Sequence, residues 1–96
     1  MGQIKISEQD IVNALCLHIA SKRQIKPQEV EIELMYDDEY GFSAESYVYD
    51  RKQVLITANI IEALRFWLET EMNIDPYSAA IELVLDDNEG IIAYIK

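Results

Sequence analysis

The stretch IELMYDDEYG at residues 32–41 returns 49 residues later as IELVLDDNEG at residues 81–90. In both copies apolar side chains occupy alternate positions, and an acidic pair and a glycine follow. Such alternation predicts a strand with one buried face. Asp and Gly are typical of a tight turn, because Asp accepts turn hydrogen bonds and Gly tolerates a left-handed backbone. Each copy therefore predicts a β-hairpin.

The match extends without a gap over residues 7–47 and 56–96. A common pattern of secondary structure would explain matching apolar positions. It would not explain a shared proline and a shared turn in one frame. We therefore interpret the chain as a tandem duplication that forms one domain over residues 1–96. Identical pairs outside the hairpin include Ile11/Ile60, Ala14/Ala63, Leu15/Leu64, Ile25/Ile74 and Pro27/Pro76.

A helix is expected before each hairpin. Ser7 and Thr57 are the predicted N-caps, and apolar residues recur behind them at helical spacing until the region of a proline. We expect an α+β fold in which a pseudo-twofold axis relates two α-β-β units. The units would form an antiparallel or mixed sheet with two helices on one face. The expected helix-facing strand residues are Val30, Ile32, Leu34, Phe42, Ala44, Val48, Ile81, Leu83, Leu85, Ile91, Ala93 and Ile95.

The charge is acidic and uneven. The net charge is −10, and residues 27–49 contain no Lys or Arg. Such a surface repels phosphates and anionic lipid, so we expect no nucleic acid and no membrane as partners. Binding of a basic partner, or mimicry of nucleic acid by the acidic hairpins, stays open. The chain shows no signal-peptide pattern, no long apolar stretch and a single cysteine, which together predict a cytoplasmic location.

The sheet face opposite the helices is the predicted interaction surface. A solvent face of a sheet normally alternates to plain polar residues. Here apolar and aromatic side chains lie among glutamates, a composition typical of an interface. We expect a homodimer or another protein to bind there, although tyrosines also occur on strands that simply face water. The predicted interface residues are Met35, Tyr47, Tyr49, Val84, Ile92 and Tyr94.

Two further sets of acids are candidate ligand sites. Glu33 and Glu82 are a repeated pair on the open face. If the pseudo-axis brings them together, a small ligand or a divalent metal could bind between the two halves, with Tyr47 and Tyr94 beside them. The turn acids Asp37, Asp38, Asp86 and Asp87 are metal candidates, but their spacing does not fit an EF-hand loop, and turn chemistry alone explains them.

The remaining reactive side chains predict no catalysis. His18 aligns with Trp67 of the other copy, which indicates packing, and Cys16 aligns with Arg65, which indicates an edge position. Two residues apart on a helix, Cys16 and His18 cannot act as a nucleophile–base pair. We therefore assign no catalytic residue and no cofactor.

Three segments carry a family resemblance: ISEQDIVNA at residues 6–14, DDEYGFSAE at residues 37–45 and DPYSA at residues 75–79. They resemble a family of small uncharacterised acidic proteins from Bacillus-type bacteria, a domain of unknown function. The resemblance covers nearly the whole chain and implies no activity and no site residues. The function that we expect is therefore a non-enzymatic interaction or regulatory role through the open sheet face.

Overall fold

The structure is a computed structural model that describes residues 4–78 and 80–96, so Ala79 of the third resembling segment lies outside the described residues. Two helices and two antiparallel sheets confirm the α+β class. In chain order the elements are β1 (Ile4–Ile6), α1 (Glu8–Arg23), a 3-10 turn (Pro27–Glu29), β2 (Val30–Asp37), β3 (Gly41–Val48), β4 (Arg51–Ile56), α2 (Thr57–Glu71), β5 (Ile81–Asp86) and β6 (Gly90–Ile95).

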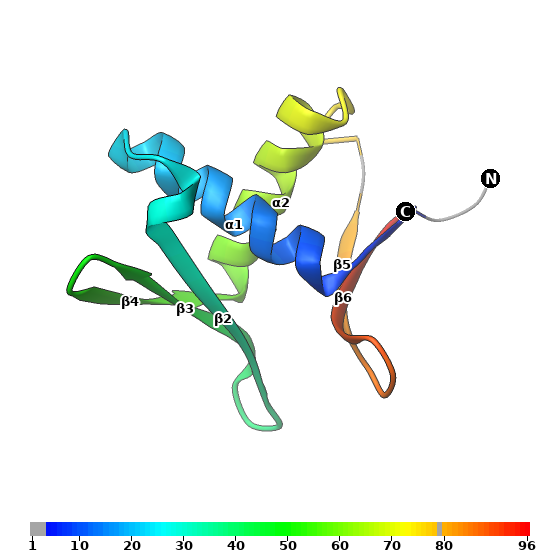
Figure 1. Cartoon of the computed structure of the whole chain (residues 1–96). Helices are drawn as coiled ribbons and strands as arrows, with labels where there is room; N and C mark the ends of the chain where they lie inside the picture. Colours follow the sequence, from blue (N-terminus) through cyan, green and yellow to red (C-terminus); the bar gives the residue numbers. More distant parts are fainter. Residues whose placement is uncertain (1–3, 79) are drawn as a thin grey trace.

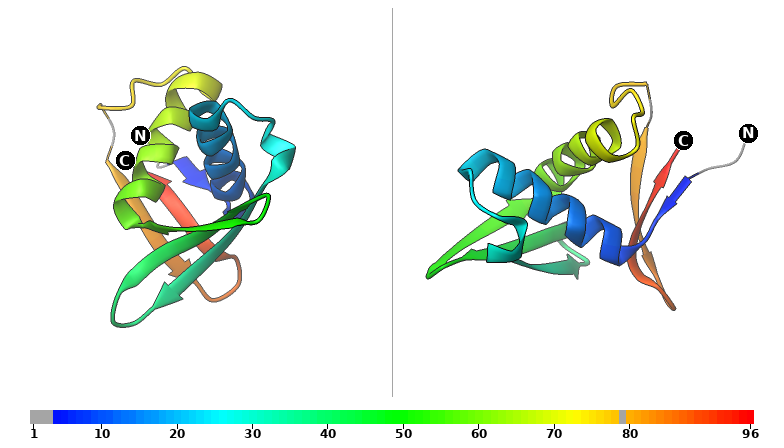
Figure 2. Two further views of the ribbon diagram at one scale, coloured as in Figure 1. Left: turned by 90° about the vertical axis from the view of Figure 1, so that its left-hand side faces the viewer. Right: turned by 45° about the horizontal axis from the view of Figure 1, so that its top comes forward.

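The strands form two three-stranded sheets where the sequence predicted one. Their orders are β2-β3-β4 and β1-β6-β5. The strand that leads into each helix pairs with the hairpin of the other unit, β4 with β3 and β1 with β6. Because these partners occupy the inner edge of each hairpin, β3 and β6 cannot pair with each other. In Figure 1 the β2-β3-β4 sheet lies at the lower left of the helices and the β1-β6-β5 sheet at their right, and the right-hand view of Figure 2 shows the same separation.

The strand register repeats at the same offset as the sequence. Leu34 pairs with Ala44 and Ala44 with Leu55, while Leu83 pairs with Ala93 and Ala93 with Ile6. Shifting one set by 49 residues gives the other. The two units therefore share element order and register. Their origin in a duplication event stays a prediction.

The ends of the helices differ between the copies. The Ser7 hydroxyl accepts a hydrogen bond from the Asp10 amide at 3.1 Å, which confirms the predicted cap of α1. Thr57 is instead the first residue of α2, and its hydroxyl donates to the Phe42 carbonyl at 2.7 Å. The capping acceptor of α2 is Asn59, whose side-chain oxygen accepts from the Ile56 amide at 3.0 Å. The prediction of a Thr57 cap was wrong, because the pairing of β4 with β3 places the Thr57 hydroxyl beside the Phe42 carbonyl, to which it donates.

One apolar core joins both helices to both sheets. The inward faces of α1 and α2 supply completely buried side chains, including Ile11, Leu15, Leu64 and Leu68. The predicted helix-facing strand residues are buried or partly buried, with one exception. Leu85 is 50% exposed, because β5 is an edge strand whose hairpin tip extends beyond the helices (Figure 1). Neither helix in the described ranges is long and apolar enough to cross a membrane.

Candidate functional site

The two separate sheets divide the predicted interaction surface. Cross-strand partners lie on the same face of a sheet, so the register defines each outer face, the one opposite the helices. Met35 and Tyr47 lie on the outer face of the β2-β3-β4 sheet, and Val84, Ile92 and Tyr94 on that of the other sheet. In rows across the first sheet the outer-face residues are Glu31, Tyr47 and Lys52; Glu33, Glu45 and Val54; Met35, Ser43 and Ile56.

The outer face of the β2-β3-β4 sheet carries exposed apolar side chains on strand β4. Val54 is 57% exposed and Ile56 is 60% exposed. Met35, in the same row as Ile56, is half-buried. Sequence reasoning did not include Val54 and Ile56 among the predicted interface residues. The signal was their alternation with Leu55, which points into the core.

Glu45 forms a polar centre in this outer face. Its carboxylate accepts from the Tyr47 hydroxyl at 2.6 Å and lies 3.2 Å from the Lys52 ammonium group. The hydrogen bond from Tyr47, and after it the one from Lys52, lower the pKa of Glu45. The same bond raises the pKa of Tyr47 to about 12. Glu45 is therefore an ionised, fixed acceptor beside the exposed apolar side chain of Val54.

Three of the other predicted interface residues do not form one surface with these. Ile92 is completely buried, which corrects its assignment to an open face. Val84 and Tyr94 are half-buried on the second sheet. Strand alternation predicts that Ile92 lies on the outer face, but it does not predict which side chains cover that face.

Tyr49 lies beyond the end of β3, in the turn to β4. Its backbone is left-handed, with a φ of 55°, and its hydroxyl donates to Glu29 at 3.0 Å. The hydrogen bond to Glu29 raises the pKa of Tyr49. Tyr49 is therefore exposed but is a turn residue and does not extend the outer face of the sheet.

The two glutamates of the predicted ligand site are on different sheets. Glu33 is on β2, and Glu82 is on β5, where it pairs with Lys96 at 2.8 Å. Tyr47 and Tyr94, predicted beside them, are likewise separated. The cleft expected on the pseudo-axis required one continuous sheet, so the structure does not assemble it.

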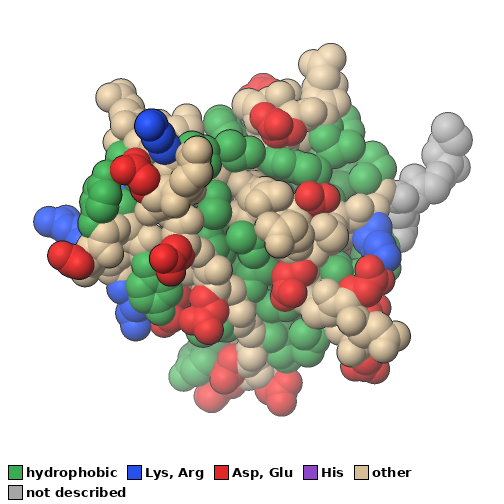
Figure 3. Space-filling view, in the orientation of Figure 1, with side chains coloured by type: hydrophobic (Ala, Val, Ile, Leu, Met, Phe, Trp, Pro, Cys, Tyr) green, Lys and Arg blue, Asp and Glu red, His purple; other side chains and the backbone are tan. Residues whose placement is uncertain are grey.

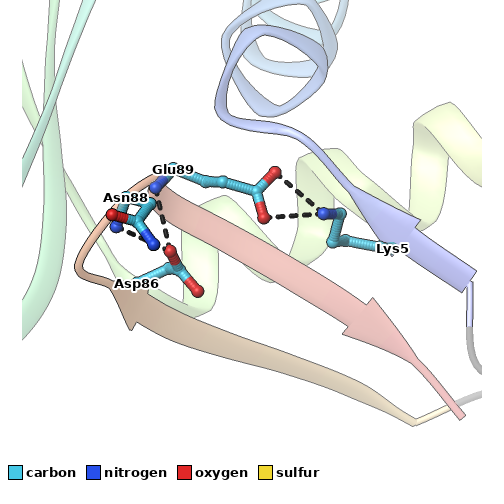
Figure 4. Close-up of polar contacts among 4 residues, drawn as sticks. All are labelled: Lys5, Asp86, Asn88 and Glu89. Carbon is cyan, nitrogen blue, oxygen red and sulfur yellow. Dashed lines mark hydrogen bonds and ion pairs between the residues drawn. The ribbon is translucent and has the colours of Figure 1, made fainter.

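The acidic turns are built by hydrogen bonds to the backbone. An Asp37 carboxylate oxygen accepts from the amides of Glu39 and Tyr40 at 2.7 and 3.1 Å. Asp86 repeats this with Asn88 and Glu89, and Lys5 holds the Glu89 side chain (Figure 4). The backbone bonds lower the pKa of Asp86. Turn chemistry thus occupies one acid of each metal candidate pair.

The second acid of each pair, Asp38 or Asp87, is exposed in its turn. Within residues 4–78 and 80–96, no group of three or more His, Cys, Asp or Glu side chains is arranged to hold a metal ion. The metal assignment of Asp37, Asp38, Asp86 and Asp87 therefore has no geometric support in the described part of the chain.

The thiol and the imidazole of α1 lie apart, as their spacing requires. Cys16 is half-buried, and its Sγ donates weakly to the Val30 carbonyl at 3.5 Å. Burial raises the pKa of Cys16, which suppresses the reactive thiolate. His18 packs edge-to-face on Phe66, with ring centroids 5.2 Å apart. The packing role predicted for His18 agrees with this contact.

His18 also borders a cleft between α1, α2 and β4. The cavity holds about 80 Å³. The Nε2 atom of His18 is 3.4 Å from the Glu62 carboxylate, and the Lys22 ammonium group is 3.3 Å from the same carboxylate. Hydrogen bonding to Lys22 and then to His18 lowers the pKa of Glu62. The lining residues are Leu15, His18, Ile19, Lys22, Arg23, Gln53, Leu55, Asn59 and Glu62.

Fold and surface together define a small acidic α+β protein built from two similar units, with an exposed apolar strand on one sheet. The chain belongs to the family described as "Protein of unknown function (DUF2653)", whose model matches residues 1–88. This confirms the predicted resemblance to an uncharacterised family.

A curated relative is similar to this chain. It is the uncharacterized protein YxcD of Bacillus subtilis (strain 168), which is 34% identical over 65 residues. The aligned part is 67% of this chain and 64% of YxcD, so the match spans less than two thirds of that relative. No solved structure matches the chain.

Proposed function

We propose that this chain is a cytoplasmic protein-interaction or regulatory protein whose outer β2-β3-β4 face binds a second copy of itself. The observation that supports this most directly is the exposure of Val54 and Ile56 at successive outward positions of one strand. Two β-branched apolar side chains more than half exposed and adjacent are costly in water. Contact with another molecule would remove that cost.

The charges on this face are complementary to themselves under a twofold rotation. Glu31 and Glu33 lie along β2 at one edge, and Lys52 lies along β4 at the other. A twofold axis parallel to β3 places the β2 row of one copy over the β4 row of the other. Because Glu31 and Lys52 share a row, Glu31 of each copy then faces Lys52 of the other, whereas Glu33 faces Val54. Such self-complementarity is what an isologous dimer requires.

The apolar side chains match under the same rotation. Met35 shares a row with Ile56, so the rotation places Met35 of one copy over Ile56 of the other. Glu45 lies near the axis, where Lys52 and Tyr47 already compensate its charge. A standard interface buries about 800 Å² per partner. That area is about an eighth of the 6208 Å² that the chain exposes.

Sedimentation velocity across a wide concentration range tests the dimer. We expect the wild type to show a concentration-dependent shift from monomer to dimer, and Val54→Lys to stay monomeric. Leu85→Lys is the matched control, because Leu85 is a similarly exposed apolar residue on the other sheet. The proposal fails if the wild type is monomeric at all concentrations, or if both variants change association equally.

A further inference from the structure

The cleft between α1, α2 and β4 has an apolar floor and a polar rim. Leu15, Ile19 and Leu55 form the floor, and all three belong to the core. A cavity of about 10–15 Å³, measured in this way, holds one water molecule. The cavity of about 80 Å³ therefore has room for a small molecule of several heavy atoms. The rim residues are His18, Lys22, Arg23, Gln53, Asn59 and Glu62.

The repeat within the chain provides an internal comparison for this cleft. At positions 49 residues away the floor is kept, because Leu15, Ile19 and Leu55 correspond to Leu64, Leu68 and Ile6. The fold therefore requires apolar residues at these three positions.

The basic part of the rim is not repeated. The positions of His18, Lys22 and Arg23 correspond to Trp67, Glu71 and Met72. The second unit folds with none of these basic groups, so packing does not demand them. Their concentration in one cleft therefore points to a role specific to the first unit.

The surroundings of the cleft are basic in a protein that is otherwise acidic. Five of the eight Lys and Arg residues lie at the end of α1 or in and beside the β3–β4 turn. Figure 3 shows most of the visible Lys and Arg side chains at the left end of the molecule, whereas Asp and Glu side chains are spread over the face. This local potential attracts anions that the rest of the surface repels. The five residues are Lys22, Arg23, Lys26, Arg51 and Lys52, of which Lys52 lies on the outer face and pairs with Glu45.

The rim retains hydrogen-bonding capacity. The Nδ1 atom of His18 is buried and has no hydrogen-bond partner among the described residues. Arg23 uses one of its guanidinium donors, at 3.4 Å, on the side-chain oxygen of Gln53. The ionised carboxylate of Glu62 meanwhile lies against Lys22 and His18. Glu62 therefore occupies the Lys22 ammonium group in the way that a bound carboxylate would.

We propose that the α1–α2–β4 cleft binds a small organic acid. Its carboxylate accepts hydrogen bonds from the Arg23 guanidinium and the Lys22 ammonium groups, and its short carbon chain lies on Leu15, Ile19 and Leu55. Arginine suits this role because its planar fork matches a carboxylate. The ligand displaces Glu62 from Lys22. This site is on the opposite side of β4 from the proposed dimer face and does not depend on it.

An NMR titration of the full chain tests the site. His18 is the single histidine, so its ring signals report on the cleft without ambiguity. The probes are sodium acetate, propionate and butyrate, and inorganic phosphate, at constant pH and with sodium chloride balancing ionic strength. We expect saturable shifts whose affinity rises from acetate to butyrate, because each added methylene contacts the floor. Shifts that do not saturate, or phosphate binding as tightly as butyrate, would overturn the proposal.

Three variants separate the cleft from a general charge effect. Arg23→Met introduces the residue of the second unit, and we expect butyrate affinity to fall about tenfold with the loss of a charged hydrogen bond. Lys26→Met removes the same charge outside the cleft and should leave affinity within about twofold. Glu62→Gln removes the competing carboxylate and should tighten binding. Equal effects of Arg23→Met and Lys26→Met, or weaker binding by Glu62→Gln, would contradict the site.

Discussion

Substitution of Ile92 distinguishes the structure from the sequence-based expectation. Strand alternation places Ile92 on an open face, whereas the structure buries it completely. Truncation of a buried Ile to Ala costs about 2–5 kcal/mol, and truncation to Val about 0.5–1.5 kcal/mol. We expect about 3 kcal/mol for Ile92→Ala and about 1 kcal/mol for Ile92→Val. An exposed residue such as Val54 should lose less than about 0.5 kcal/mol on truncation to Ala.

Urea unfolding followed by the fluorescence of Trp67 measures these losses, because Trp67 packs against the core and is the single tryptophan. A domain of this size has a total stability of about 5–15 kcal/mol. With a slope of about 1.5 kcal/mol per molar urea, a loss of 3 kcal/mol lowers the midpoint by about 2 M. A loss under about 1 kcal/mol for Ile92→Ala, or equal losses for Ile92→Ala and Val54→Ala, would refute the burial.

Three further outcomes are expected. Gly41 and Gly90 both have φ near 80°, but a Cβ at Gly90 would lie 2.9 Å from the Glu8 carboxylate, which also accepts from the Ile91 amide. Gly41→Ala costs about 1–2 kcal/mol from backbone strain alone. In thermal unfolding Gly90→Ala should lower stability more than Gly41→Ala, and equal losses would count against the contact with Glu8. Tyr47, with a pKa of about 12, should remain protonated in an absorbance titration up to about pH 11. Because this folded-state pKa lies above the unfolded value, the hydrogen bond to Glu45 stabilises the fold fully below about pH 10, and that stabilisation is lost as the pH rises through 12. Glu45→Gln should lower the pH at which Tyr47 titrates, and an unchanged titration would exclude the bond. Cys16 should react slowly with a disulfide reagent at neutral pH and rapidly in urea, because burial raises its pKa; fast labelling of the native chain would disagree with its placement.

The hairpins could be predicted because their determinants are local. The aspartate that accepts backbone hydrogen bonds and the glycine with positive φ lie within five residues of each other in both turns. The cap of α1 by Ser7 is equally local. Thr57 shows the limit of such reasoning, because a distant carbonyl, that of Phe42, competes for its hydroxyl.

The pairing of β1 and β4 could not be predicted from the sequence. Ile6 pairs with Ala93, and Leu55 pairs with Ala44, but nothing in these short apolar segments specifies the partner strand. That choice splits the expected single sheet into two. It also decides which faces are exposed: Ile92 is buried, whereas Val54 and Ile56, which the interface prediction omitted, are exposed.

The α1–α2–β4 cleft could not be predicted from the sequence either, because it also depends on how distant segments pack. Lys22 and Arg23 fit the last turn of a helix, where positive charge is favoured, so their positions needed no other explanation. Their relation to Gln53 and Glu62 appears only when β4 and α2 pack against α1. The contrast of Arg23 with Met72 was visible in the sequence, and it is the signal that could have directed attention to this end of the molecule.

The exchange of leading strands between the two units imposes an order on folding during synthesis. The β2-β3-β4 sheet needs residues 30–56, so it can form once Ile56 has left the ribosome. Strand β1 waits longer, because Ile4 pairs with Ile95, which is made much later. Until β6 has been made, β1 has no strand to pair with, and α1 packs on the first sheet alone. Strand β1 is thus made well before its partner, and the second sheet is complete only after the β5–β6 hairpin has been made.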